Sequence, residues 1–470
     1  MRKRPFISCL AVAAAALSAS GAAAAGTLTV GPGMQYAAPC AAFAAATDGD
    51  TIEIDAAGNY DGDVCAIAKN NLTIVGVNGR AKIDAAGKDA QGKAIWVVQG
   101  SDTTIENIEL SGATVTDMNG AGIRQEGKNL TVRGCYFHDN EDGILAGDVA
   151  GSEILIEYTE FDHNGAGDGY SHNLYINHVA KLTFQFNWSH SAQIGHLLKS
   201  RAAETYVLYN RLSGESDGSE SYEIDVPNGG KTYVIGNLIE QGTQTDNPSL
   251  LSYLEEGANA NNPSNELFVV NNTFVNDLGS GTFVTVGDSA TTPAVLANNI
   301  FFGGGTITNQ AGAQQSHNES GASSCLVDAA AFDYHLLGGT PCVDAGADPG
   351  DGDGFALLPA FQYVHEAARE SRTSQGAIDI GAYELGGGTA GTAGASGASG
   401  GSAGTSTGGS GGSNAGAGPG NGGQSASAGM SSKSGDDSGC ACRMAPSSTP
   451  VVRSLSSVAL LLLLARRRRK

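Results

Sequence analysis

The residues best suited to chemistry gather in one stretch of the chain. Five of the nine histidines fall within it: His163, His172, His178, His190 and His196. The same stretch and the segment after it supply a phenol, two amides, two cations and two carboxylates, namely Tyr175, Asn173, Asn177, Lys199, Arg201, Glu223 and Asp225. Elimination across a sugar acid needs groups that neutralise its carboxylate, a base and an acid. The stretch therefore predicts a site for uronic-acid chemistry.

The spacing of these residues predicts that they lie on neighbouring strands. Tyr175 and Lys199 are 24 residues apart, and so are His172 and His196. Adjacent strands lie about 4.8 Å apart, so residues one repeat apart can touch. Because side chains alternate across a strand, Leu174 and its apolar partners should face a core. The polar set expected to face outward comprises Asn173, Tyr175, Asn177, Lys199 and Arg201.

The register of the next repeat is less regular. Strict counting sets Asp225 against Leu198, whereas apolar alternation turns Ile224 and Val226 toward the core. We follow the alternation, which moves the register by one residue and turns Glu223 and Asp225 outward. Tyr175, Lys199 and one of these carboxylates then form one functional column, with His172 and His196 stacked at its rim.

The elements that must hold this column are the coils of a repeat. Apolar alternation that runs into a turn recurs at steps of 24 to 35 residues, with the anchors Leu110, Phe137, Phe161, Trp188, Leu212, Ile239, Phe274 and Phe301. Such self-similarity indicates units that bury their apolar faces against their neighbours. The runs are short, β-branched and bounded by Gly, Asn and Asp, as strands are. We predict an all-β protein, a right-handed single-stranded parallel β-helix, in which Asn210, Asn237, Asn272 and Asn299 stack as an amide ladder.

The elimination hypothesis gives each outward side chain a role. Lys199 is the expected base, because a neighbouring cation such as Arg201 would lower its pKa. Tyr175 or His172 is the expected acid, and Arg201 with Asn177 would bind the substrate carboxylate. The remaining residues, expected to bind or orient the substrate or to ligate a metal ion, are Asn173, His196, Glu223 and Asp225.

Two other hypotheses fit the same residues. Glu223 and Asp225, two positions apart on one strand, lie about 6.6 Å apart at the backbone, which is compatible with glycoside hydrolysis. Alternatively, Lys199 and Arg201 pair with these carboxylates as a charge ladder, and the protein is a non-catalytic glycan-binding surface protein or adhesin. The density of functional groups favours elimination.

Three segments resemble known proteins. Leu197-Leu198-Lys199-Ser200, followed by Asn210, is similar to the Lys-Ser strand of the chondroitinase B and alginate lyase family. That resemblance implies a polysaccharide lyase with a lysine base and a calcium cofactor. The sequence departs from the family in having His196 where a calcium-ligating acid is expected, and no arginine acid on the following coil. An Ala-rich helix near residues 41–46 and a closing segment at 379–384 resemble the ends of secreted β-helix proteins of the pectate-lyase-like superfamily.

The ends of the chain differ in composition from its centre. A basic start, an apolar run and small residues predict a signal peptide at residues 1–25, ahead of a β-helix domain at 26–385. Residues 386–439 are almost all Gly, Ser, Ala and Thr and predict a flexible linker. Residues 440–470 join Cys440 and Cys442 to a short apolar segment and an Arg cluster, which resembles the MYXO-CTERM sorting tail of myxobacterial surface proteins. The resemblance implies a processing protease as partner and attachment to the outer cell envelope through Cys440 or Cys442.

Charge and cysteines bound the partners and the compartment. Ten of the 26 basic residues lie in segments 1–25 and 440–470, which hold no acidic residue, so residues 26–439 carry 16 basic against 48 acidic residues, a net of −32. This balance argues against nucleic acid and anionic membrane as partners. The expected partner is polysaccharide, bound by a secreted protein that is expected to be a monomer. Cys40 with Cys65, and Cys325 with Cys342, could each close a disulfide in an oxidising compartment. Cys135 is expected to be a buried free thiol.

Overall fold

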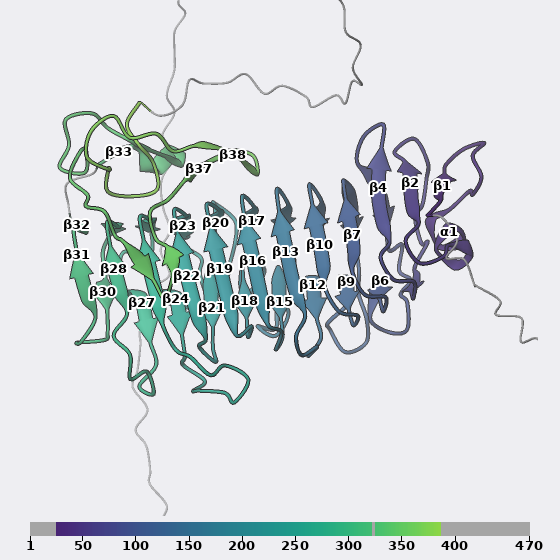
Figure 1. Ribbon diagram of the computed structural model, residues 1–470, viewed down its shortest axis with the longest axis horizontal. Helices are drawn as coiled ribbons and strands as arrows, with labels where there is room; N and C mark the ends of the chain where they lie inside the picture. Colours follow the sequence, from purple (N-terminus) through teal and green to yellow (C-terminus); the bar gives the residue numbers. More distant parts are fainter. Residues whose placement is uncertain (1–24, 322–324, 387–470) are drawn as a thin grey trace, which may run out of the picture. The chain divides into compact units, whose positions relative to one another are not determined.

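The computed structural model describes residues 25–321 and 325–386, and their body is a right-handed parallel β-helix, as predicted (Figure 1). Each full coil supplies one strand to each of three parallel sheets, here called A, B and C. Sheet A contains β1 (Thr27–Val30), β2 (Thr51–Asp55), β4 (Thr73–Val77), β7 (Thr103–Glu106), β10 (Leu130–Arg133), β13 (Glu153–Glu157), β16 (Lys181–Gln185), β19 (Glu204–Leu208), β22 (Lys231–Ile235), β25 (Leu267–Val270), β28 (Val295–Ala297) and β31 (Gln314–Ser316). Sheet B contains β3 (Cys65–Ile67), β6 (Ala94–Val98), β9 (Ala121–Gln125), β12 (Asp142–Ala146), β15 (Leu174–Ile176), β18 (Lys199–Ser200), β21 (Ile224–Val226), β24 (Ser249–Tyr253), β27 (Thr282–Val286) and β30 (Thr306–Thr308). Sheet C contains β5 (Ala81–Asp84), β8 (Ile108–Ser111), β11 (Tyr136–His138), β14 (Glu160–Asp162), β17 (Trp188–His190), β20 (Arg211–Ser213), β23 (Leu238–Gln241), β26 (Thr273–Asn276), β29 (Ile300–Gly303) and β32 (Glu319–Gly321).

The N-terminal end of the stack is closed by a short helix, α1 (Pro39–Ala45). Its Ala42 and Phe43 are buried, and the Phe43 ring meets the Trp96 ring edge-on at 5.3 Å. A disulfide joins Cys40 of α1 to Cys65 of β3. The helix therefore covers apolar side chains that would otherwise end the stack in contact with water, and both the plug and this disulfide were predicted.

An amide ladder runs inside the corner between sheets A and C. Each Asn side chain donates from Nδ2 to the Oδ1 of the next, at 2.9 to 3.1 Å, which confirms the predicted ladder. The structure extends it at both ends; the six members are Asn187, Asn210, Asn237, Asn272, Asn299 and Asn318. Because every amide also holds backbone groups, the ladder fixes the chain at the turn between the strands of sheets A and C.

One predicted anchor of the repeat was wrong by one residue. Trp188 pairs with Glu160 and Arg211 on the outer face of sheet C, whereas Ser189 takes the inward position between Phe161 and Leu212. The coil before it is one residue longer than the aromatic pattern suggested. A serine is accommodated in the core here because its hydroxyl donates to the Leu197 carbonyl at 2.8 Å.

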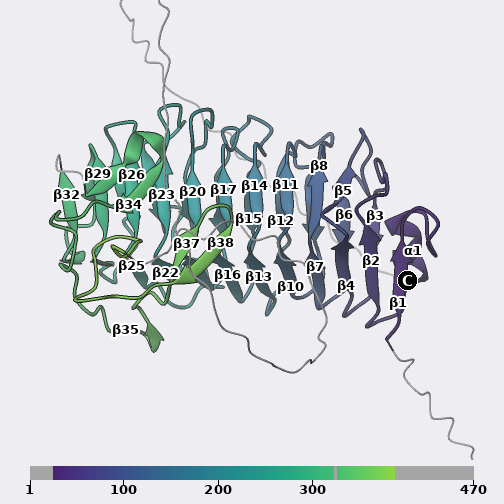
Figure 2. The same ribbon diagram turned by 90° about the horizontal axis from the view of Figure 1, so that it is seen from above.

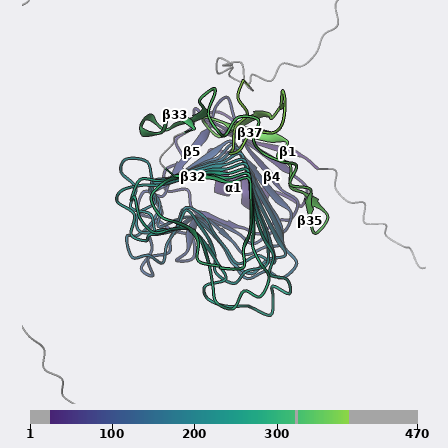
Figure 3. The same cartoon turned by 90° about the vertical axis from the view of Figure 1, so that its left-hand side faces the viewer.

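A C-terminal cap folds back over the solenoid after β32 (Figures 2 and 3). It contains β33 (Leu326–Asp328), η1 (Ala329–Ala331), β34 (Asp333–Leu336), β35 (Asp351–Gly352), β36 (Phe355–Ala356), β37 (Phe361–Val364) and β38 (Ala368–Ser371). The cap packs Tyr334 and Tyr363 against apolar residues of sheet C, and Leu357 against those of sheet A. Its disulfide, Cys325–Cys342, was predicted, and Cys135 is a buried free thiol as expected. These contacts leave the outer face of sheet B free of the cap.

The other predicted segments lie outside the described residues. They are the signal peptide up to residue 24, the linker beyond residue 386, and the sorting tail with Cys440 and Cys442. Within the part of the chain that the structure describes, no helix is long and apolar enough to cross a membrane.

Candidate functional site

Three outward side chains form a column across sheet B. Tyr175 of β15 pairs with Lys199 of β18, and Lys199 pairs with Asp225 of β21. Their neighbours Ile176, Ser200 and Ile224 are fully buried. Strand alternation therefore turns the polar residues outward, as predicted, and the one-residue shift of register at Asp225 is confirmed.

Lys199 lies at the centre of the column and is nearly enclosed. Its Nζ is 3.2 Å from Asp225 Oδ2, 3.5 Å from His196 Nε2 and 3.9 Å from Glu256 Oε1. The Lys199 side chain is 12% exposed and that of Asp225 only 5%. Burial raises the pKa of Asp225, although the Lys199 ammonium opposes this shift. The pair thus holds a proton between two groups with little access to water.

Arg201 connects the column to the loop after β24. Its Nε donates to Tyr175 Oη at 2.9 Å, and its two terminal nitrogens donate to the Glu256 carboxylate at 2.7 and 3.0 Å. Asn228 also accepts from Arg201. The Arg201 hydrogen bonds lower the pKa of Glu256, so this carboxylate stays ionised. Because Tyr175 Oη accepts from Arg201, its own proton remains available to a ligand.

Two stacked histidines form the edge of the site. The rings of His172 and His196 are 4.3 Å apart and nearly parallel, as predicted. His172 Nδ1 accepts from the His196 backbone N–H at 3.0 Å, and His196 Nδ1 accepts from that of Tyr222 at 3.4 Å. Burial, helped by Lys199, lowers the pKa of His172 to about 3, and burial lowers that of His196 well below its usual value. Both rings are therefore neutral near pH 7, and His172 is a weaker candidate for the acid than Tyr175.

Two residues expected on the face instead point into the solenoid. Asn173 is fully buried, where its amide donates to Ser189 Oγ at 3.1 Å and to the His190 carbonyl at 2.9 Å. Glu223 is also fully buried, and neither of its carboxylate oxygens has a hydrogen-bond partner. Both residues stand on the turn just before a strand begins, where alternation does not yet apply. Their predicted outward orientation was wrong.

Two earlier expectations do not fit this geometry: glycoside hydrolysis by Glu223 with Asp225, and a bound calcium ion. Glu223 and Asp225 do not share a face, so they form no exposed carboxylate pair for glycoside hydrolysis. In residues 25–321 and 325–386, no three His, Cys, Asp or Glu side chains converge as metal ligands. The calcium implied by the family resemblance therefore does not fit the side chains present, and we derive no step through it.

Asn177 stays half-buried at the end of the column and accepts from the His178 backbone N–H.

Sequence reasoning missed the two residues that hold Arg201, which are Glu256 and Asn228. Glu256 lies two coils beyond Arg201, on a loop whose length the repeat does not set. The register of Arg201 extends through Pro227 to Leu254, two residues before Glu256, so the repeat alone does not reach it. A shallow cavity of about 380 Å³ adjoins this loop and is lined by Glu255, Glu256 and Asp288 among others. The face of sheet B thus continues beyond Arg201 into an acidic recess.

The family model of a right-handed β-helix region matches residues 50–239, in agreement with the fold. A search of curated proteins found no match. Among solved structures, the chain is similar to pectate lyase Pel9A, with 14% identity and a TM-score of 0.48 over 73% of this chain and 90% of that one. It is also similar to an alginate lyase from Paenibacillus sp. str. FPU-7, with 14% identity and a TM-score of 0.37 over 63% of this chain and 99% of that one. The three parallel sheets, together with the family match, make the chain a right-handed parallel β-helix protein.

Proposed function

We propose that this protein is a polysaccharide lyase that cleaves uronic-acid-containing polysaccharide by β-elimination on the outer face of sheet B. The observation that carries the proposal is the convergence of Lys199, Arg201 and Tyr175 on one sheet face that the cap leaves uncovered. The Arg201 guanidinium neutralises the carboxylate of a uronate and so acidifies its C5 proton. A phenol beside it can protonate the leaving oxygen.

The contacts suggest how the three groups divide the work. Glu256 occupies Arg201, but its side chain is half exposed, so a uronate carboxylate can replace it. Tyr175 accepts from Arg201 and keeps its own proton for the leaving oxygen. Lys199 takes the C5 proton in its neutral form. A sugar that covers the Lys199–Asp225 pair removes water from it, which favours the neutral pair with the proton on Asp225.

The cross-links support a proposal for the compartment. Two disulfides support a protein that works in an oxidising environment outside the cytoplasm. We therefore extend the proposal to a secreted protein attached to the outer cell envelope, which acts as a monomer on polysaccharide. The sequence of the C-terminal tail, with its processing protease, supplies the attachment.

A second candidate function is glycan binding without catalysis. It is favoured by the internal pairing of the cations, because Lys199 contacts Asp225 and Arg201 contacts Glu256. A protonated Lys199 held in this way would bind an acidic sugar and would not remove a proton from it.

The test is the ultraviolet absorbance of unsaturated product over alginate, pectate, glycosaminoglycans and bacterial exopolysaccharides. Wild type should give product, and Lys199→Ala should lose at least about a hundredfold in kcat, the usual share of a general base. Lys128→Ala, which removes an exposed lysine from the bend before β10, is the matched control and should keep full activity. If the protein binds a glycan of the panel but gives no product, the lyase proposal is wrong and the second candidate function, glycan binding without catalysis, takes its place.

A further inference from the structure

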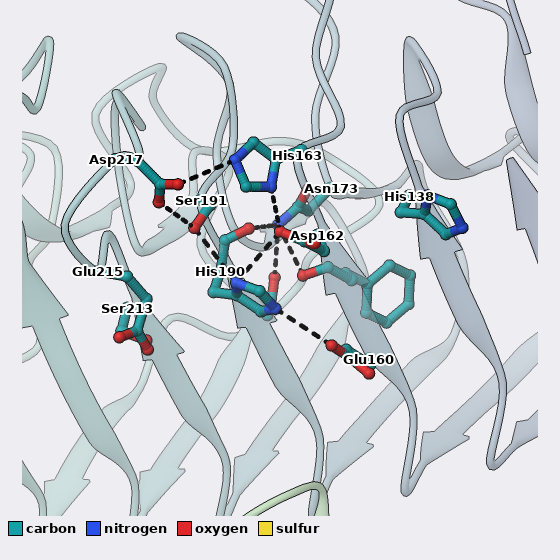
Figure 4. Close-up of polar contacts among 12 residues, drawn as sticks. His138, Glu160, Asp162, His163, Asn173, His190, Ser191, Ser213, Glu215 and Asp217 are labelled. Atoms are coloured by element: carbon teal, nitrogen blue, oxygen red, sulfur yellow. Dashed lines mark hydrogen bonds and ion pairs between the residues drawn. The ribbon is translucent and has the colours of Figure 1, made fainter. Parts of the chain in front are cut away.

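Five side chains on three consecutive coils form a closed ring of polar contacts at the corner between sheets C and B (Figure 4). His163 contacts Asp162 through Nδ1 and Asp217 Oδ2 through Nε2 at 3.4 Å. Ser191 Oγ donates to Asp217 Oδ1 at 3.1 Å and lies 3.2 Å from His190 Nδ1. His190 Nδ1 closes the ring at 3.2 Å from Asp162 Oδ1. We call these residues the Asp–His ring.

His163 is the member of the ring whose charge the geometry depends on most. Its two ring nitrogens face different carboxylates, and only the imidazolium can donate from both. Asp162 precedes His163 in the chain, Asp217 comes from the loop after β20, and Asp139 from the turn after β11. Burial by itself lowers the pKa of His163, but these three carboxylates outweigh it and raise the pKa. His190, the last residue of β17, and Ser191, in the turn after it, are the other groups on this side.

The ring and the candidate site stand at opposite ends of the same three loops. Residues 163–173 lead from the ring to His172 and Tyr175, and residues 191–198 lead to His196 and Lys199. Residues 214–223, which carry Asp217, lead to Asp225. Backbone hydrogen bonds join these loops to one another, for example from Leu197 N to the Tyr222 carbonyl at 3.0 Å. A shift of one loop at the ring therefore changes the spacing of the column at the other end.

We infer that the Asp–His ring positions the candidate site, and that protonated His163 holds the loop of Asp217 in place. The inference rests on the proposed function, because it concerns the spacing of Tyr175, Lys199 and Asp225. When His163 loses its proton, one of its two carboxylates faces a lone pair and the 214–223 loop is released. A histidine held charged by carboxylates contributes below its folded pKa and loses its contribution as the pH rises through it. The site is therefore best ordered on the acid side and loosens toward alkaline pH.

Hydrogen exchange tests the positioning without any substrate. Amides that join the loops, such as Leu197 N and Ser221 N, are compared at about pH 6 and about pH 9 after correction for intrinsic exchange. In wild type the corrected protection should fall between these pH values. In His163→Gln the corrected protection should already be about tenfold lower than in wild type at the lower pH, which corresponds to the loss of one charge-assisted hydrogen bond. Equal protection in the variant and wild type at both pH values would overturn the inference.

His138→Gln is the matched control. His138 also lies between two carboxylates, with Asp139 at 2.7 Å from Nδ1 and Glu109 at 3.3 Å from Nε2, but it stands one coil earlier and outside the ring. Its protection should follow wild type. On any substrate that the panel identifies, His163→Gln should show a lower kcat than wild type at the lower pH and a similar kcat at the higher pH, as expected of a residue that positions the acid and the base. A panel without product would remove the proposed reaction but leave the exchange result standing.

Discussion

At the scale of single residues, the most unusual group in the molecule is the carboxyl of Glu223. It lies inside the solenoid, and the equivalent positions in the coils on either side are the buried leucines Leu197 and Leu250. Neither oxygen has a partner, and burial, with the nearby Glu220 and Glu240 carboxyls, raises its pKa well above the usual value. The folded protein therefore keeps this proton, whereas the unfolded chain releases it above its ordinary pKa.

We expect Glu223→Leu to stabilise the protein, and more so at alkaline pH. The folded state binds one more proton than the unfolded state between the two pKa values of Glu223, so wild-type stability falls as the pH rises through this window. Leucine removes the titration and an unpaired buried polar group, a gain on the order of 2 kcal/mol. Urea unfolding at about pH 5 and about pH 8 measures this gain in stability, since both pH values lie above the ordinary glutamate pKa.

The control for this change is Glu153→Leu, at a glutamate whose side chain is 60% exposed on sheet A. This substitution should leave the free energy of unfolding within about 0.5 kcal/mol of wild type at both pH values, as surface substitutions do. A Glu223→Leu protein that is less stable than wild type at both pH values would mean that the carboxylate is satisfied and needed.

At the scale of elements, the amide ladder joins neighbouring coils at their turns, as strand pairing joins them within the sheets. Asn237, near its middle, accepts from the backbone N–H and the amide of Asn210 and donates to Val207 and Asn272. Asn237→Ala should cost about 3 kcal/mol, because it leaves several buried groups unpaired at once. Thermal unfolding compares it with Asn318→Ala, whose residue ends the ladder and is only partly buried. Equal losses of stability at Asn237 and Asn318 would contradict the idea that each amide stabilises the fold through hydrogen bonds to its two neighbours in the ladder.

Elements also explain how far the sequence could lead. Strand pairing is regular, so the alternation of Leu174, Tyr175 and Ile176 predicted which side chains reach the outer face of sheet B. The rule stops at the strand boundary, and for that reason Asn173 and Glu223 were placed on the wrong side. Glu256 was missed because the loop that carries it has no counterpart in the repeat. Neither a turn conformation nor a loop path is encoded in a two-residue period.

The Asp–His ring shows the same limit from another direction. Asp217 carries no pattern in the sequence that would place it beside His163. The residue reaches His163 only because the loop after β20 bends back over the preceding coil. Long-range pairing of charges across loops depends on the folded path of each loop, which composition and periodicity do not specify.

At the scale of the whole molecule, a solenoid is stabilised by contacts between neighbouring coils, so its ends can open independently of its middle. The cap's disulfide Cys325–Cys342 lies near the C-terminal end, beside Tyr334, and the rest of the cap runs back along sheets A and C as far as Phe186 and Trp188. The candidate site lies on a different face, on β15, β18 and β21 of sheet B. A weaker cap should therefore leave the site intact.

We expect the double substitution of Cys325→Ser with Cys342→Ser to loosen the cap alone. Opening a cross-link of this length, at a sequence separation of 17, releases about 3 kcal/mol of chain entropy. Amides of the cap, such as Leu337 N and Ile380 N, should exchange faster, while Arg201 N, which bonds to the Ile176 carbonyl, should keep its protection. The equivalent pair of substitutions at Cys40 and Cys65 should act on the opposite end. Uniform acceleration across all coils would instead mean that the molecule opens as one cooperative unit, and that a change at either end reaches the site.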